Sequence, residues 1–312
     1  MAALYTYRHA PPTVTRWTAP TGIGGDGGDP GQSWVPLTGL ATTRDDKRFS
    51  VVSSNANSMR EQIDFTDSVV VVTGGASDVG RAISESFAEE GADVVVADID
   101  DERGREAVTS VSEATEDARA TYVHTDVSSY EACESLVEDV LDEFGRIDVL
   151  VNAAAVAAPS VISKPFLEEG PDDWEPQLRV TFMGTVNPTH AALPALVEQE
   201  GAVVNLCSEA YKGQDTQYAM YGAAKSAVAT FTRTLAKEVG EDGVRINAIS
   251  PSATRTEATE AFLDRFGDAV TDQHALPRLG RPTDHANLAV FLASDAADWI
   301  TGQVVSVNGG YL

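Results

Sequence analysis

The segment that most constrains the fold begins at Ser68 and reads SVVVVTGGASDVGRAISESFAEEGA. Its first part is a short, continuous run of β-branched residues, which indicates a parallel strand buried on both faces. Glycines follow this run, and Val79, Ile83 and Phe87 then recur on one stripe of a helix that Gly91 ends. A strand, a glycine-rich turn and a helix in this order predict the first unit of an α/β fold.

The same alternation of apolar runs and helical patterns continues to the end of the chain. It predicts an α/β protein with a doubly wound parallel sheet, the Rossmann fold, in a single domain. Ser128 and Glu131 form a capping-box pattern that predicts the start of the helix after the third strand. The expected strands are 68–74, 93–100, 120–127, 147–155, 201–208, 243–250 and 303–310, and the expected helices include 101–117, 172–199, 256–274 and 283–293.

Residues 1–58 differ from the rest, because they are rich in Pro, Gly, Thr and Ser and show no sustained hydrophobic period. Such a composition is typical of disorder. We therefore expect a disordered extension over 1–58 and a folded domain over 59–312. Met59 opens that domain, so a translation start at Met59 is also expected.

The chain carries 48 acidic and 22 basic residues, a formal net charge of −26. A phosphate backbone or an anionic membrane would be repelled, so neither nucleic acid nor a membrane is an expected partner. The acids are scattered along the chain, which is typical of hydrated protein surfaces in a high-salt cytoplasm.

Cysteine usage and hydropathy bear on location. Cys133 and Cys207 lie in apolar stretches and predict neither a disulfide framework nor a metal site. No apolar run reaches membrane-spanning length, and no signal-peptide pattern opens the chain. The expected location is the cytoplasm.

Three residues near the middle of the chain have spacings that suit acid–base chemistry. Tyr221 and Lys225 are four apart, so they lie on one face of the expected helix, which continues to about Val239. Ser208 ends the fifth expected strand, so the strand end and the helix can converge. Free tyrosine titrates near pH ~10, and a nearby cation favours the phenolate. These three residues therefore predict a site in which Tyr221 is the general acid–base and the Ser208 hydroxyl holds the reacting oxygen.

A second group of residues surrounds the turn between Thr73 and Gly80. Glycines there allow close approach of a pyrophosphate, and a helix N-terminus supplies free N–H groups, although a plain strand–helix turn is the alternative. Arg81 and Ala82 stand where a P-loop needs Lys and Ser/Thr. Asp98 ends the second strand. A carboxylate there can accept hydrogen bonds from ribose hydroxyls and repel a 2′-phosphate. This favours NAD over NADP, and the alternative for Asp98 is an ordinary loop acid.

The chain resembles the classical short-chain dehydrogenase/reductases from about Phe65 to Leu312. The resemblance is carried by several ordered motifs at matching separations. They are TGGASDVG, Asp126-Val127, VNAAA, Ser208, YGAAK, RINAISP and the C-terminal TGQVVSVNGG.

The resemblance implies a role for each matching residue. Tyr221 would be the catalytic acid–base, Lys225 would lower the Tyr221 pKa and bind the nicotinamide ribose, and Ser208 would bind the reacting oxygen. The implied cofactor-binding residues are Gly74, Ser77, Asp78, Val79, Gly80, Asp98, Asp126, Val127, Asn152, Tyr221, Lys225, Pro251 and Thr256. A homo-tetramer is implied as well.

Four positions depart from the family pattern. Asp78 replaces a glycine of TGxxxGxG, the NNAG motif is Asn152-Ala-Ala-Ala155, and Ser252 replaces the glycine after Pro251. Thr181 stands where the family has an Asn that holds a water linking the catalytic Lys to solvent. Thr181 is a candidate catalytic residue, because its hydroxyl could hold such a water; whether it replaces the Asn in that relay is an open question at the level of the sequence.

The expected function is therefore an NAD-dependent oxidoreductase that moves a hydride between the cofactor and a secondary alcohol or ketone, its small-molecule substrate. A dinucleotide-binding protein without turnover is the second hypothesis, motivated by Asp78 and Thr181. A short-chain enzyme of another reaction type, such as an epimerase or dehydratase, is the third. The substrate itself cannot be read from the segments 153–175, 209–217 and 252–280.

Overall fold

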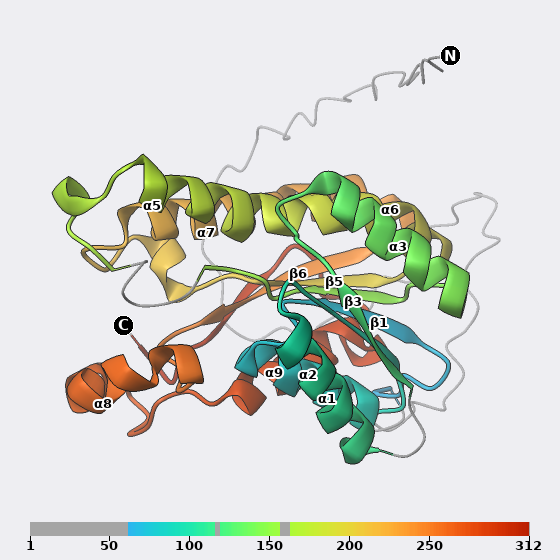
Figure 1. The fold of residues 1–312 in the computed structure, drawn as a ribbon, viewed down its shortest axis with the longest axis horizontal. Helices are drawn as coiled ribbons and strands as arrows, with labels where there is room; N and C mark the ends of the chain where they lie inside the picture. The colour runs from blue at the N-terminus through green and yellow to red at the C-terminus, as the bar shows by residue number, and fades with distance from the viewer. Residues whose placement is uncertain (1–61, 116–118, 157–162, 312) are drawn as a thin grey trace, which may run out of the picture. The chain divides into compact units, whose positions relative to one another are not determined.

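The computed structural model describes residues 62–115, 119–156 and 163–311. The expected extension over 1–58 and the start at Met59 lie outside these residues. The described chain forms a seven-stranded parallel sheet in the order β3-β2-β1-β4-β5-β6-β7 (Figure 1). The strands are β1 Val69–Thr73, β2 Asp93–Asp98, β3 Ala120–His124, β4 Val149–Asn152, β5 Ala202–Leu206, β6 Arg245–Pro251 and β7 Val304–Val307. The doubly wound parallel sheet expected from the sequence is confirmed.

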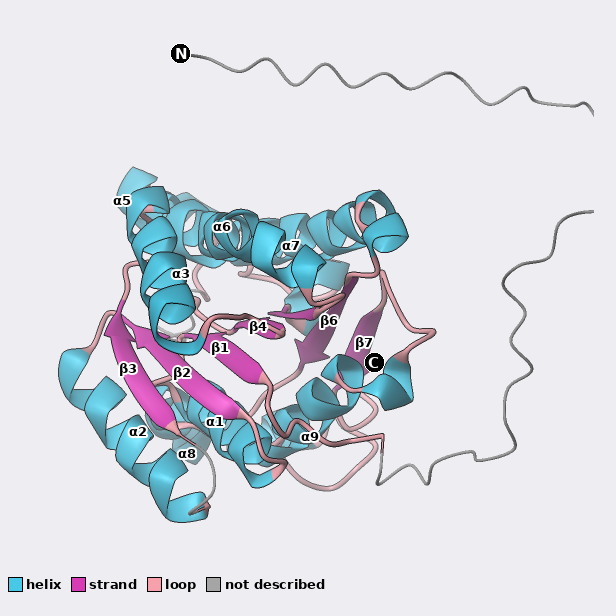
Figure 2. Cartoon of the chain, turned by 90° about the vertical axis from the view of Figure 1, so that its right-hand side faces the viewer, coloured by secondary structure: helices cyan, strands magenta, loops and turns pink. Residues whose placement is uncertain are grey.

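Helices cover both faces of the sheet, with α1, α2 and α9 on one face and α3, α6 and α7 on the other (Figures 1 and 2). The helices are α1 Asp78–Glu89, α2 Asp101–Ala114, α3 Tyr130–Phe144, α5 Pro171–Pro176, α6 Gly184–Glu198, α7 Ala219–Glu238, α8 Glu257–Thr271 and α9 Pro282–Ala293, with a π-helix η2 Gln177–Met183 and a 3₁₀-helix η3 Glu209–Lys212. None of the helices in the described part of the chain is long and apolar enough to cross a membrane.

The valine run of β1 supplies the core on both sides. Val70 and Val72 pack with α1 and α9, and Val69 and Val71 pack with α3 and α6. All the β1 residues are buried. Because successive side chains of a strand point to opposite faces, only a continuously apolar run satisfies a strand covered on both sides.

The chain reverses its winding direction between β1 and β4. Strand β1 pairs with β2 on one side and with β4 on the other, so the connections on the two sides run in opposite directions. In open α/β sheets, ligands bind outside the carboxyl ends of the strands at this point. Thr73, Ala97 and Asn152 are in register there, at or next to the ends of their strands.

One helix start differs from the expectation. Ser129, not Ser128, is the N-cap of α3, and its hydroxyl accepts a hydrogen bond from the Ala132 N–H at 3.2 Å. The Ser128 N–H donates to the Asp126 carboxylate at 2.9 Å. That Asp126 turn holds Ser128 outside the helix, so the capping-box prediction was wrong by one residue.

Candidate active site

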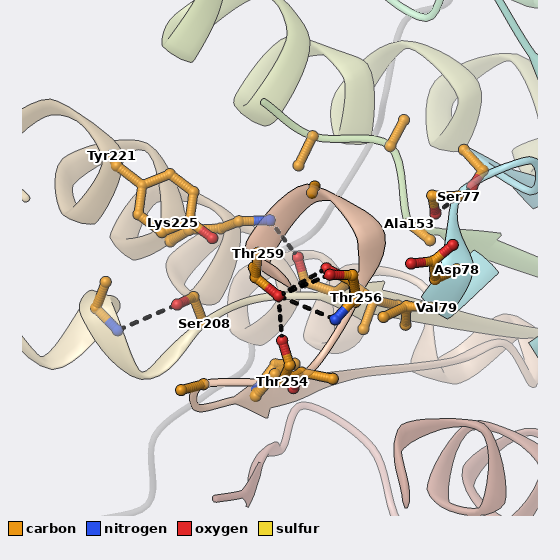
Figure 3. Close-up of a pocket in the computed structure, with 18 of the residues that line it drawn as sticks. Ser77, Asp78, Val79, Ala153, Ser208, Tyr221, Lys225, Thr254, Thr256 and Thr259 are labelled. Carbon is orange, nitrogen blue, oxygen red and sulfur yellow. Dashed lines mark hydrogen bonds between the residues drawn. The ribbon is translucent and has the colours of Figure 1, made fainter. Parts of the chain in front are cut away.

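A cavity of about 810 Å³ opens at the carboxyl ends of the strands. It runs from the turn after β1 to the start of α7, and segments from β2, β4, β5, β6 and α8 complete its lining. Figure 3 shows Tyr221 and Lys225 on one side of the cavity and the glycine-rich turn on the other. The topology therefore joins residues from several strand ends and helix starts in one volume.

The glycine-rich turn is shaped by two close approaches. Gly74 has φ +66°, and a Cβ on it would lie 2.6 Å from the Ala154 backbone nitrogen. A Cβ on Gly80 would lie 2.1 Å from the Gly74 carbonyl oxygen. Ser77 caps α1, because its hydroxyl accepts from the Gly80 N–H at 3.2 Å and donates to the Gly74 carbonyl at 2.7 Å. Gly74, Ser77, Asp78 and Val79 line the cavity, whereas Gly80 packs behind the turn.

Asp78 joins the start of α1 to the start of α8. Its carboxylate accepts from the Glu257 backbone N–H at 2.5 Å and lies 3.5 Å from the Arg103 guanidinium. The acid therefore faces a cation and a helix N-terminus, both of which stabilise negative charge. These contacts explain how the turn accommodates an aspartate where the family motif has a glycine.

Asp98 lines the cavity at the end of β2 and already accepts two hydrogen bonds. The Ala76 N–H donates to one carboxylate oxygen at 3.0 Å, and the Asp100 N–H donates to the other at 3.1 Å. Each carboxylate oxygen can accept more than one hydrogen bond, so the group keeps capacity for ligand hydroxyls. Asp126 and Val127 line the cavity beyond β3, next to Asp98.

The structure brings Ser208, Tyr221 and Lys225 together. Ser208 follows β5, and its hydroxyl accepts from the Ala210 N–H at 3.3 Å. Tyr221 and Lys225 lie one turn apart on α7, both buried, and the Lys225 ammonium is 5.9 Å from the centre of the Tyr221 ring. Lys225 donates a hydrogen bond of 2.6 Å to the Leu206 carbonyl. All three residues line the cavity.

Burial controls the titration of this group. It raises the pKa of Tyr221 to about 12, although the nearby Ser208 hydroxyl opposes the shift. It lowers the pKa of Lys225 to about 8, because an ammonium loses its hydration inside the protein. The sequence predicts a lowered pKa for Tyr221; in this structure that pKa is raised instead, because burial removes water from the phenol.

Known proteins are similar to this chain in sequence. A family model described as enoyl-(acyl carrier protein) reductase matches residues 74–312. Meso-2,3-butanediol dehydrogenase of Serratia marcescens is 39% identical over 246 residues, which cover 79% of this chain and 95% of that protein. A 3-oxoacyl-(acyl-carrier-protein) reductase of Thermotoga maritima is 32% identical over 243 residues, 78% of this chain and 96% of that protein.

The fold matches as well. The crystal structure of a short-chain dehydrogenase/reductase (glucose/ribitol dehydrogenase) from Brucella melitensis superposes with a TM-score of 0.74 at 33% identity, over 80% of this chain and 98% of that one. The chain belongs to the short-chain dehydrogenase/reductase family. It is therefore a dehydrogenase or reductase of a family that uses a nicotinamide dinucleotide.

The cavity of this short-chain dehydrogenase/reductase fits such a cofactor. The bare Cα atoms of Gly74 and Gly80 bring backbone close together at the N-terminus of α1, where N–H groups and the helix dipole favour a pyrophosphate. Asp98 and Asp126 line the cavity at the ends of β2 and β3, and Pro251 and Thr256 line it between β6 and α8. No group of three or more His, Cys, Asp or Glu residues in the described ranges could hold a metal ion.

Three residues that the family pattern assigned to the site lie outside the cavity lining, namely Gly80, Asn152 and Thr181. The Thr181 hydroxyl, on η2, accepts from the Val156 N–H at 3.2 Å and donates to the Gln177 side chain at 3.3 Å. These contacts use its donor and one of its two acceptor positions. Lys225 binds the Leu206 carbonyl at 2.6 Å. The catalytic role of Thr181 stays a prediction.

Asn152 makes its contacts behind the cavity lining. It is buried, and its amide donates to the Thr189 hydroxyl at 2.9 Å and to the Asn205 side chain at 2.8 Å. Asn152 thus ties β4 to β5 and α6 rather than facing the cavity, which Ala153, Ala154 and Ala155 line at this strand end.

Sequence analysis missed Glu209, the residue after Ser208. Its carboxylate is buried and accepts hydrogen bonds from Ser250 at 2.8 Å, Ser306 at 2.7 Å and Asn308 at 3.1 Å, and it pairs with Lys212 at 2.5 Å. Burial opposes its charged form, but these partners outweigh burial and lower the pKa. Glu209 thereby fixes the Ser208 loop to β6, β7 and the C-terminal turn.

Proposed function

We propose that this enzyme transfers a hydride between NAD(H) and a secondary alcohol or ketone, with Tyr221 as the acid–base. The supporting observation is the convergence of Ser208, Tyr221 and Lys225 in one cavity with Asp98. Asp98 provides a carboxylate for ribose hydroxyls, which supports NAD over NADP.

Each residue has a separate task. When bound, the nicotinamide supplies the hydride acceptor or donor. In oxidation Tyr221, as the phenolate, takes the hydroxyl proton of the alcohol, and in reduction the protonated phenol gives its proton to the carbonyl oxygen. Ser208 donates a hydrogen bond to that oxygen, and the Lys225 ammonium holds a ribose hydroxyl.

The test is an absorbance assay at 340 nm of the full chain with NAD⁺ or NADH, carried out in both low and molar salt. The names of the two relatives suggest meso-2,3-butanediol and a 3-oxoacyl thioester as first substrates, beside simple secondary alcohols. We expect turnover of at least one alcohol or ketone with NAD(H). Tight cofactor binding without turnover of any of them would instead support the catalytically weak dinucleotide-binding protein.

Cofactor choice is expected to depend on Asp98. Replacement Asp98→Ala removes the acceptor for ribose hydroxyls, so the ratio of kcat/KM for NAD to that for NADP should fall by about 10- to 100-fold. Asp98→Asn is the matched control for size, since it keeps one carbonyl oxygen that can accept from Ala76 or Asp100. Steady-state kinetics with both cofactors measures the ratio, and a wild-type preference for NADP would overturn the assignment.

The pH profile is expected to report Lys225. Tyr221, with a pKa of about 12, stays protonated and able to donate a proton in reduction throughout the neutral range. Lys225 loses its ammonium charge as the pH rises through its pKa of about 8. We therefore expect kcat/KM for ketone reduction to be constant in the acidic range and to fall above pH ~8. A profile that stays flat to pH ~10 would show that Lys225 keeps its charge.

We also infer the oligomeric state of the protein and the environment in which it works. The net charge of −26 supports a chain adapted to high salt, because screening reduces the repulsion within each subunit and between subunits. A homo-tetramer in the cytoplasm, with no nucleic-acid or membrane partner, fits the family resemblance and the acidic surface.

A further inference from the structure

A group of polar and aromatic side chains lines the cavity beside Tyr221. We call Asp215, Tyr218, His274 and Tyr311 the polar wall; all four line the cavity. The Tyr218 ring centre lies 6.2 Å from that of Tyr221, so the polar wall begins next to the acid–base. Its members come from the loop before α7, from the segment after α8 and from the C-terminus.

Asp215 and Tyr311 form the central contact of the polar wall. The Tyr311 hydroxyl donates a hydrogen bond to one oxygen of the Asp215 carboxylate. Burial and this carboxylate both raise the pKa of Tyr311, so the phenol stays protonated and remains a donor. The His274 ring lies 5.2 Å from the Tyr311 ring, centre to centre, and packs against it.

The polar wall is held in place from behind. Asn308 donates to the Tyr311 carbonyl at 3.1 Å and also to the buried Glu209 at 3.1 Å. His274 Nδ1 lies 2.8 Å from the Val270 carbonyl, which can only accept, so Nδ1 carries the proton. Nε2 lies 2.9 Å from the Ser252 hydroxyl, within hydrogen-bond distance. Tyr311 and His274 are therefore fixed before a substrate arrives, as specific recognition requires.

The charge of the polar wall is not balanced. The second oxygen of Asp215 has no hydrogen-bond partner, and no ion pair involves Asp215, within the described ranges. Arg103 and Lys225 are the Arg and Lys side chains among the described residues that line the cavity. Arg103 pairs with Asp78 and Glu257, and Lys225 binds the Leu206 carbonyl, so neither offsets Asp215.

This arrangement selects for a particular kind of substrate group. A carboxylate accepts hydrogen bonds and repels anions, so a substrate carboxylate or phosphate beside Asp215 would be disfavoured. A hydroxyl can donate to Asp215 and also accept from a neighbouring phenol such as Tyr218. An ammonium group could donate as well, but it could not accept.

We propose that Asp215 is a specificity-determining residue that accepts a hydrogen bond from a second hydroxyl of the substrate. The substrate class is then a neutral diol or polyol, of which one secondary hydroxyl is oxidised at Tyr221 and another binds the polar wall. This inference rests on the proposed oxidoreductase function and adds the substrate class to it.

The test compares Asp215 variants on substrates that differ by one hydroxyl. The probes are 2-pentanol, 2,3-pentanediol and 2,4-pentanediol, with 4-amino-2-pentanol and 3-hydroxybutanoate as the cationic and anionic analogues. For wild type we expect kcat/KM for at least one diol to exceed that for 2-pentanol by about 10- to 100-fold, the range expected for a hydrogen bond to a charged group. Asp215→Ala should remove this difference by raising KM for the diol. Its kcat/KM for 2-pentanol should stay within about threefold of wild type, and its kcat/KM for 3-hydroxybutanoate should rise.

Asp272→Asn is the matched control, because it also removes one acid but its exposed side chain does not line the cavity. It should change none of the ratios, and Asp215→Asn serves as a second variant that preserves the shape of the wall.

Equal activity on 2-pentanol and on both diols, or an Asp215→Ala loss that is the same for every substrate, would overturn the inference while leaving the oxidoreductase function intact. A preference for 4-amino-2-pentanol over the diols would also overturn it. Failure of every alcohol with either cofactor would instead refute the proposed function.

Discussion

Replacement Tyr221→Phe is expected to lower kcat by about 10²–10⁴-fold, the range assigned to general acid–base catalysis. Tyr221 is buried with 8% of its surface exposed, and its ring packs near Tyr218 at 6.2 Å. The variant keeps this ring and removes only the group that exchanges a proton with the substrate. Folding and cofactor binding should therefore persist, as measured by thermal unfolding and by NADH fluorescence titration.

Tyr218→Phe is the matched control for this experiment. Tyr218 lines the same cavity and is the nearest competing phenol, but no lysine lies four residues after it. It should lower kcat for 2-pentanol by no more than about threefold, well below the range for an acid–base residue. A Tyr221→Phe enzyme with most of the wild-type kcat, or equal losses in the two variants, would contradict the mechanism.

The fold could be predicted because its determinants are local. The β1 valines, the Gly91 stop and the recurrence of the pattern are visible along the chain, and the structure places strands and helices accordingly. Tyr221 and Lys225 were brought together by helical spacing alone. The position of Ser208 near these two residues could be predicted from one further rule, that parallel strands end at a common edge of the sheet.

The remaining features depend on contacts between distant segments. The Glu257 backbone that binds Asp78 is 179 residues away along the chain, and Ser306 and Asn308 are 97 and 99 residues from Glu209. No spacing rule predicts such partners. The Thr181 hydroxyl likewise accepts a hydrogen bond from the Val156 N–H, which is 25 residues away along the chain.

The direction of the Tyr221 pKa shift could not be predicted for a related reason. Helical spacing shows that Lys225 is near, which favours the phenolate, but it says nothing about how much water reaches the phenol. Tyr221 and Lys225 are both buried, so each is displaced toward its neutral form. Burial is a property of the assembled fold, and spacing along a helix does not reveal it.

Replacement Gly80→Ala is expected to disrupt the cofactor-binding turn. The added Cβ would lie 2.1 Å from the Gly74 carbonyl oxygen and 2.9 Å from the Gly75 Cα. These neighbours are backbone atoms, so the clash cannot be relieved by a side-chain rotation. The Gly74 carbonyl is also held in place, because it accepts a hydrogen bond from the Ser77 hydroxyl. Overpacking of this kind costs about 1–3 kcal/mol or more, and each kcal/mol lowers Tm by about 2–4 °C in a domain of this size.

The same movement should weaken cofactor binding, because it shifts the N–H groups at the start of α1. A loss of about 1.4 kcal/mol of binding free energy is a tenfold rise in Kd, which we take as the minimum for Gly80→Ala. Gly240→Ala is the matched control, since a Cβ there meets no atom within 4 Å and the residue has no positive φ. A glycine-to-alanine change at such a compatible site stabilises by about 0.4–1 kcal/mol. Calorimetry and NADH titration of the two variants test the turn: if Gly80→Ala keeps the Tm and Kd of Gly240→Ala, the close approach of Gly74 and Gly80 does not shape the cofactor site.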